Sequence, residues 1–154
     1  MAVERARAHG LGVTVIATAE PRDDEMAERI RVHREERPSV WSTIEEPLQL
    51  EQAIAGVDEG ETLVIDCLTL WVSNLLERGD SDGEVDAQSS TALRRAGSRG
   101  GLTLVVSNEV GLGIVPANEL ARRFRDVLGR VNARWAAAAD EALFLVAGRA
   151  LALP

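Results

Sequence analysis

The amino-acid sequence predicts an α/β domain built on a mostly parallel sheet. Short apolar runs alternate with amphipathic segments of helical period, which is the pattern of successive strand and helix units. Residues 62–65 form an apolar run without alternation, as expected for a strand covered on both faces. Polar residues follow several runs, at the edge where open α/β sheets bind ligands. We therefore expect one domain over residues 1–154 with a ligand site at this edge.

In the first half of the chain, strands are expected at residues 11–17, 40–45 and 62–65. The first is rich in β-branched residues, the second alternates like a half-exposed strand, and the third is the buried run. Helices are expected at residues 1–9, 25–36 and 47–55. Gly10 is placed to end the first helix, Asp23 or Asp24 to cap the second, and Pro47 to begin the third.

In the second half, helices are expected at residues 68–76, 85–96 and 118–139, and strands at 102–107, 142–146 and 150–153. Turn formers and acids at residues 79–86 indicate a surface loop. The first helix has a strong apolar face, formed by Leu68, Trp71, Val72, Leu75 and Leu76. The second has a thin apolar face and is expected at the periphery. Asn118 should cap the third, whose inward residues would be Leu120, Phe124, Val127, Leu128, Val131 and Trp135.

Composition excludes several classes of function. The 154 residues carry a formal net charge of -8, which repels nucleic acid and anionic membrane surfaces. The single Cys67 excludes an internal disulfide, and the sequence shows neither a signal peptide nor an apolar stretch of membrane-spanning length. We expect a cytoplasmic protein. All 17 basic residues are arginines, so the motif G-x-x-x-x-G-K-[ST] does not occur in this sequence.

Asp66 stands directly after the buried apolar run, where the strand leaves the core. A carboxylate at this edge is well placed to hold Mg²⁺ on a bound nucleotide. The alternative is that Asp66 caps the helix that begins near Leu68. These residues alone leave both readings open. Other polar residues that follow strands are Thr18, Glu20, Glu45, Asn108 and Glu109, and together they predict a ligand site.

The expected helix at residues 25–36 carries arginines interleaved with glutamates. Such a run is usually a solvated face with ion pairs four residues apart. His33 lies among the arginines, which would favour its neutral, nucleophilic form by repelling a second positive charge. A solvated face and a reactive His33 are both compatible with the pattern. The apolar stripe that we expect this helix to bury consists of Met26, Ala27 and Ile30.

Three segments together resemble one enzyme family. They are residues 15–21 with 24–30, 33–34 and 37–38; residues 66–71 with 74–76; and residues 107–116 with 121–126. The third, Ser-Asn-Glu-Val-Gly-Leu-Gly-Ile-Val-Pro, is the most specific. The family is adenosylcobinamide kinase/adenosylcobinamide-phosphate guanylyltransferase, which acts in coenzyme B12 (cobalamin) biosynthesis. The resemblance covers nearly the whole chain.

The resemblance implies a RecA-like P-loop fold with helices on both faces of the sheet, often assembled as a homotrimer. It also implies two reactions, which are phosphoryl transfer to adenosylcobinamide and transfer of GMP from GTP to adenosylcobinamide phosphate. Mg²⁺ with GTP or ATP would be needed. In the family, the second reaction passes through a guanylylated histidine. The position matching that histidine is His33, and Val32 before it leaves one acceptor where some relatives have two.

The same resemblance implies a guanine-nucleotide site. Its residues would be Thr18, Ala19, Glu20, Arg34, Glu35, Glu36, Arg37, Glu45 and Asp66. Asp66 would be the Mg²⁺ carboxylate, directly or through water.

The sequence differs from the family at its front. Family members open with a strand and a glycine-rich P-loop, whereas residues 1–10 match only the tail of the following helix. The missing strand is expected beside the Asp66 strand, so its loss would leave two unpaired strand edges. One hypothesis is an enzyme whose residues keep the family roles, and another is an inactive fragment or subunit-interaction module. A third is guanylyl transfer without the kinase reaction.

Overall fold

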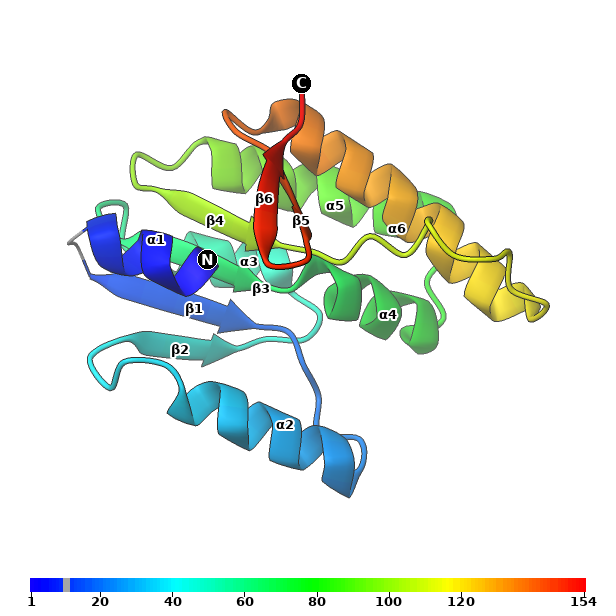
Figure 1. Cartoon of the computed structure of the whole chain (residues 1–154), viewed down its shortest axis with the longest axis horizontal. Helices are drawn as coiled ribbons and strands as arrows, with labels where there is room; N and C mark the ends of the chain where they lie inside the picture. Colours follow the sequence, from blue (N-terminus) through cyan, green and yellow to red (C-terminus); the bar gives the residue numbers. More distant parts are fainter. Residues whose placement is uncertain (10–11) are drawn as a thin grey trace. The chain divides into compact units, whose positions relative to one another are not determined.

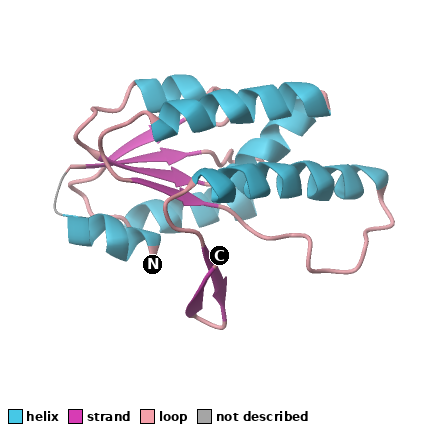
Figure 2. Ribbon diagram, turned by 90° about the horizontal axis from the view of Figure 1, so that it is seen from above, coloured by secondary structure: helices cyan, strands magenta, loops and turns pink. Residues whose placement is uncertain are grey.

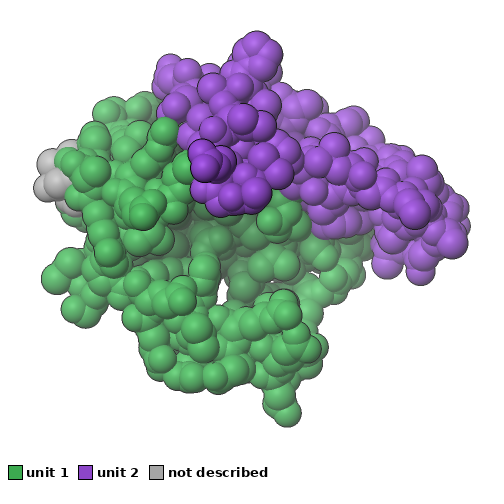
Figure 3. All heavy atoms as spheres, in the orientation of Figure 1, with its two compact units in different colours: residues 1–108 green, residues 109–154 purple. Residues whose placement is uncertain are grey.

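The computed structural model describes residues 1–9 and 12–154, which form two compact units (Figures 1 and 3). Unit 1 is Met1–Asn108 and unit 2 is Glu109–Pro154. The expected helix cap at Gly10 and the first residue of the expected strand, Leu11, lie outside the described residues. That the whole chain is one domain stays a prediction.

Unit 1 is built on a four-stranded parallel sheet with the strand order β2-β1-β3-β4. The strands are β1 (Val13–Ala17), β2 (Ser42–Glu45), β3 (Thr62–Asp66) and β4 (Thr103–Val106). Residues 62–65 of β3 are buried, as the unalternating apolar run predicts. The predicted α/β fold with a mostly parallel sheet is therefore confirmed, and the arrangement is consistent with a RecA-like, P-loop-type fold.

The sheet is continuous at β3, and the expected interruption there was wrong. Ile65 lies opposite Ile16 of β1 on one side and opposite Val105 of β4 on the other. A buried strand without a neighbour would leave N-H and C=O groups unpaired, at about 1–3 kcal/mol for each group. Because β4 pairs directly with β3, these groups are satisfied within the sheet.

Five helices accompany this sheet, and they lie on both sides of its strands (Figure 2). They are α1 (Ala2–His9), α2 (Asp24–Glu35), α3 (Leu50–Ala55), α4 (Leu68–Arg78) and α5 (Asp82–Gly97). Helix α1 contacts β3 and β4, whereas α3 contacts β1 and packs against α5. The cap of α2 is Asp23, whose carboxylate accepts a hydrogen bond from the backbone N-H of Met26 at 2.7 Å.

Helix α4 is the best-packed helix of unit 1. All five residues of its predicted apolar face are buried, which confirms that prediction. The indole N-H of Trp71 also donates to the carbonyl oxygen of Leu48 at 2.9 Å. Gly79 ends the helix with φ of 102°, a left-handed conformation that glycine adopts without strain. Because α4 begins two residues after Asp66, its packing holds the carboxyl end of β3 in place.

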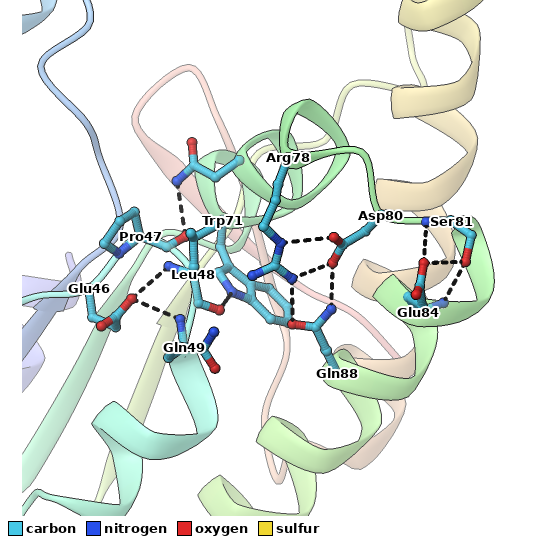
Figure 4. A network of polar contacts seen from close by, with 11 residues as sticks. Glu46, Pro47, Leu48, Gln49, Trp71, Arg78, Asp80, Ser81, Glu84 and Gln88 are labelled. Atoms are coloured by element: carbon cyan, nitrogen blue, oxygen red, sulfur yellow. Dashed lines mark hydrogen bonds and ion pairs between the residues drawn. The ribbon is translucent and has the colours of Figure 1, made fainter.

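The starts of two helices differ by three residues from those predicted (Figure 4). Helix α3 begins at Leu50 rather than at Pro47, because the Glu46 carboxylate accepts from the backbone N-H groups of Leu48 and Gln49 and forms a turn there. Helix α5 begins at Asp82, inside the segment predicted as a loop. A capping box between Ser81 and Glu84 stabilises the start of this helix. The Ser-x-x-Glu spacing is visible in the sequence, and the predicted loop did not take it into account.

Unit 2 contains α6 (Glu119–Ala138) and an antiparallel hairpin of β5 (Leu143–Val146) and β6 (Arg149–Ala152). Asn118 caps α6 by accepting from the N-H of Ala121, as predicted. Four of its predicted inward residues are buried, namely Val127, Leu128, Val131 and Trp135, whereas Leu120 is 55% exposed. None of the helices in the part of the chain that the structure describes is both long and apolar enough to cross a membrane.

Candidate active site

Two of the predicted acidic residues, Glu45 and Asp66, end the two strands that flank β1, at the same edge of the sheet. In the parallel register, Ala17 at the end of β1 lies opposite Asp66 of β3 on one side and opposite Glu45 of β2 on the other. The carboxyl ends of three strands therefore converge here, where open α/β sheets bind ligands. The register confirms that these residues share one edge.

Asp66 is the centre of a cluster that joins β3 to the carboxyl end of α2. Its Oδ2 lies 3.3 Å from Nε2 of His33 and 3.2 Å from Nη2 of Arg37. Nδ1 of His33 lies 3.4 Å from a carboxylate oxygen of Glu36. The residue that caps α4 is Cys67, without any side-chain cap bond. The alternative reading of Asp66 as the helix cap is therefore wrong.

His33 is more accessible than the two residues that it meets at the end of β3. Its side chain is 62% exposed, compared with 23% for Asp66 and 12% for Arg37. Carboxylates rather than arginines lie nearest to both ring nitrogens, so the expectation of arginine neighbours was wrong. The reason is that the neighbouring arginines pair elsewhere: Arg31 with Glu28 and Glu35, and Arg34 with Glu45. An exposed imidazole between two carboxylates can be reached by a ligand in solution.

A pocket of about 540 Å³ opens beside this cluster, between the end of α2 and β2. Its lining residues are Arg34, Arg37, Pro38, Ser39, Trp41, Thr43 and Glu45. The volume is in the range of small-molecule sites. Arginines can pair with phosphate oxygens, and an indole can stack on a base. Trp41 was predicted only as part of the strand at residues 40–45. The available signal was an aromatic side chain close to a strand that ends in Glu45.

Thr18 is fully buried, and its hydroxyl is used inside the protein. The hydroxyl donates to the carbonyl oxygen of Cys67 at 2.7 Å and accepts from the Cys67 N-H at 2.9 Å. Its own N-H donates to the carbonyl oxygen of Asp66 at 3.0 Å. Thr18 therefore fastens the ends of β1 and β3 together. Half-buried Ala19 and Glu20 follow it in the loop toward α2.

The predicted nucleotide residues thus fall into separate places. The structure brings together His33, Glu36, Arg37 and Asp66, and it places Arg34 with Glu45 at the adjoining pocket. Glu35 instead pairs with Arg31 along α2. Glu20 pairs with Arg22 at 2.9 Å. Buried Asn74 of α4, which belongs to one of the segments that resemble the family, holds the adjacent loop.

Burial raises the pKa of the Cys67 thiol, and the adjacent Asp66 carboxylate acts in the same direction. A higher pKa leaves a smaller thiolate fraction at a given pH, and the thiolate is the reactive form. We expect iodoacetamide at pH 8 to modify the native protein at least about tenfold more slowly than the urea-unfolded protein. Mass spectrometry over time measures both rates. Equal rates would contradict the buried position of this side chain.

The acidic residues here fit a metal ion carried by a nucleotide rather than a dedicated protein cage. Within the described ranges, no group of three or more His, Cys, Asp or Glu side chains could hold a metal ion. Mg²⁺ in nucleotide sites is commonly held by one or two carboxylates together with phosphate oxygens and water. Asp66, partly exposed at the end of β3, is the carboxylate that fits this arrangement.

Comparisons with known proteins show the family of this chain. Residues 1–153 match the family model described as cobinamide kinase / cobinamide phosphate guanyltransferase. A relative from Pseudomonas aeruginosa, bifunctional adenosylcobalamin biosynthesis protein CobP, is 42% identical over 149 residues, covering 96% of this chain and 86% of the relative. The CobU proteins of Escherichia coli and Salmonella typhimurium are 39% and 40% identical, each covering 88% of this chain and 82% of the relative. The chain therefore belongs to the cobinamide kinase/cobinamide phosphate guanyltransferase family.

Proposed function

We propose that this chain transfers GMP from GTP to adenosylcobinamide phosphate through a guanylylated His33. The observation that supports this most directly is the exposed imidazole beside Asp66, next to a pocket lined by Arg34 and Arg37. Family membership supports the substrate class, because both reactions in the family description act on cobinamides.

In the first half of the proposed reaction, an unprotonated ring nitrogen of His33 attacks the α-phosphorus of GTP. A nitrogen-phosphorus bond forms, and the bond from the α-phosphorus to the bridging oxygen breaks, so pyrophosphate leaves. In the second half, a phosphate oxygen of adenosylcobinamide phosphate attacks the same phosphorus and the imidazole leaves. The product contains the GMP unit, and His33 returns to its starting form.

The neighbouring residues have distinct roles in this proposal. The Glu36 carboxylate accepts a hydrogen bond from Nδ1-H of His33, which leaves the unprotonated Nε2 on the Asp66 side for attack. Arg34 and Arg37 neutralise phosphate oxygens, and Trp41 with Glu45 receives the guanine base. Asp66 would hold Mg²⁺ on the nucleotide, where the ion would neutralise negative charge. For nucleotide to bind, the pairs that Arg34 and Arg37 make with Glu45 and Asp66 must exchange for phosphate.

The structural argument above covers guanylyl transfer alone, because this sequence contains no lysine to place on transferring phosphates. The kinase reaction, the use of ATP and assembly as a homotrimer are proposed for this protein from the family resemblance alone. Thr18, Ala19, Glu20 and Glu35 are proposed on the same basis as residues near the nucleotide.

A labelling experiment tests the proposal. Purified protein is incubated with Mg²⁺ and GTP labelled at the α-phosphate, and bound label is tested for lability to acid and resistance to base, the signature of a phosphorus-nitrogen bond. We expect stable label from α-labelled GTP, none from γ-labelled GTP, and loss of labelling when EDTA removes Mg²⁺. Adding adenosylcobinamide phosphate should discharge the label. No covalent label, or equal label from both forms of GTP, would overturn the proposal.

A further inference from the structure

Helix α2, which carries His33, is not held by a hydrophobic core. None of its residues is buried, and the expected stripe of Met26, Ala27 and Ile30 was wrong, since Ala27 is exposed and the other two are half-buried. The space-filling view shows an opening between α2 and the rest of unit 1 (Figure 3). Three apolar residues are too few for a helix to gain its position from burial. Polar links must therefore set where α2 lies.

At its carboxyl end, α2 is tied to the sheet by the groups that a nucleotide would engage. Arg34 pairs with Glu45, and both His33 and the following Arg37 face Asp66. If the arginines exchange these partners for phosphate, the ties at this end change during each catalytic cycle. A helix that must present His33 accurately then needs a fixed point at its other end.

The amino-terminal end of α2 has such a fixed point, built around Arg22. Arg22 donates through Nη2 to the side-chain oxygen of Asn74 at 2.7 Å. The same guanidinium pairs with Glu77, one turn further along α4, and with Glu20 at 2.9 Å. Arg22 precedes the Asp23 cap of α2 directly, so this link fixes the point where the helix begins.

Asn74 uses its whole side chain to hold the loops at this edge. Its amide nitrogen donates to the carbonyl oxygen of Thr18 at 2.8 Å and to that of Pro47 at 3.1 Å. The residue is 5% exposed. Trp71, one turn earlier on α4, donates to Leu48 in the same loop (Figure 4). Because α4 is packed in the core, these bonds connect the loops to a rigid element.

We infer that Asn74, acting through Arg22, is a positioning residue that holds the start of α2 and thereby sets His33 against Asp66. This inference depends on the proposed function of His33. Neither Asn74 nor Arg22 touches the reacting atoms in this arrangement. Their contribution is that the nitrogen attacking the α-phosphorus stays in place while Arg34 and Arg37 change partners.

Hydrogen exchange tests the anchor without any chemistry. In Arg22→Gln, the amides of residues 25–35 should exchange about tenfold faster than in the wild type, because a charge-assisted link is lost. Amides of β1 and β3 should be unchanged. Arg22→Lys, which keeps one charged donor, should recover most of the protection. Unchanged exchange of α2 in Arg22→Gln would overturn the inference whether or not His33 is guanylylated.

Adduct kinetics test the consequence for His33. Arg22→Gln should slow the formation of the α-phosphate adduct about tenfold at saturating GTP, and Arg22→Lys should stay within about threefold of the wild type. Arg31→Gln is the matched control, because Arg31 pairs with Glu28 and Glu35 of its own helix, and the rate in this variant should stay within about twofold of the wild type. The double variant Asn74→Leu/Arg22→Gln should form the adduct no more slowly than the slower of the two single variants, because both residues act through one link.

The outcomes separate the two proposals. A wild-type adduct whose rate is the same in Arg22→Gln would remove the positioning role and leave guanylyl transfer standing. Additive losses in the double variant would show that the two residues do not act through one link. Absence of an adduct in the wild type would remove the proposed function, and the exchange measurement would still decide whether Arg22 anchors α2.

Discussion

Replacing His33 by Ala should abolish labelling of the chain by α-labelled GTP. The imidazole supplies the nitrogen of the proposed bond, and Val32 before it offers no second acceptor. Gel autoradiography or intact-mass measurement after incubation with Mg²⁺ and GTP gives the result. We expect the loss to be complete, because His33 is the only imidazole beside Asp66 among the described residues.

The other histidine provides a matched control. His9 lies on α1, and its Nδ1 is 3.1 Å from the hydroxyl of Thr62, at the opposite end of β3 from Asp66. His9→Ala should therefore keep the label. GTP binding by His33→Ala, measured by calorimetry, should stay within about threefold, since the arginines of the pocket remain. Label retained in His33→Ala would remove His33 from the mechanism.

Asp66→Asn should slow adduct formation by about 10²- to 10³-fold, the range typical of a lost charged group at a reacting centre. The substitution keeps the shape of the side chain and removes the negative charge that faces both His33 and Arg37. It also removes the carboxylate proposed for Mg²⁺. Rates are measured over a series of Mg²⁺ concentrations. In Asp66→Asn, the Mg²⁺ concentration that gives half of the maximal rate should be higher than in the wild type.

Asp58→Asn is the control for this change of charge. Asp58 is exposed in the turn before β3, away from the carboxyl edge of the sheet, and its carbonyl oxygen rather than its carboxylate accepts from Arg99. The rate in this variant should stay within about twofold of the wild type. An unchanged rate and unchanged Mg²⁺ dependence in Asp66→Asn would contradict both roles given to Asp66.

Much of the fold was predictable because its signals are local. The buried run of β3, the apolar face of α4 and the caps at Asp23 and Asn118 each follow from the side chains of a short segment. The start of α5 carried an equally local signal in Ser81 and Glu84, so that boundary was predictable in principle. The edge of the sheet shared by Glu45 and Asp66 followed from the parallel topology.

The exposure of α2 and the continuity of the sheet could not be predicted in this way. The apolar stripe of Met26, Ala27 and Ile30 indicates that the helix could bury one face. Whether another part of the protein covers that face depends on the rest of the fold. The pairing of β3 with β4 depends on which strands meet when the chain closes. The partners of the arginines likewise lie far along the chain, 29 positions away for Arg37 and Asp66 and 52 positions away for Arg22 and Asn74.

By itself, the sequence determined the α/β class, the central strand, the position of Asp66 after it and, through its likeness to one family, the choice of His33. Tertiary structure alone decided that His33 lies between Glu36 and Asp66, that Trp41 lines the adjoining pocket, and that Arg22 and Asn74 hold the start of α2. The physical reason is that strand and helix signals come from neighbouring residues, whereas side-chain pairing across a site depends on distances that only the packed chain fixes.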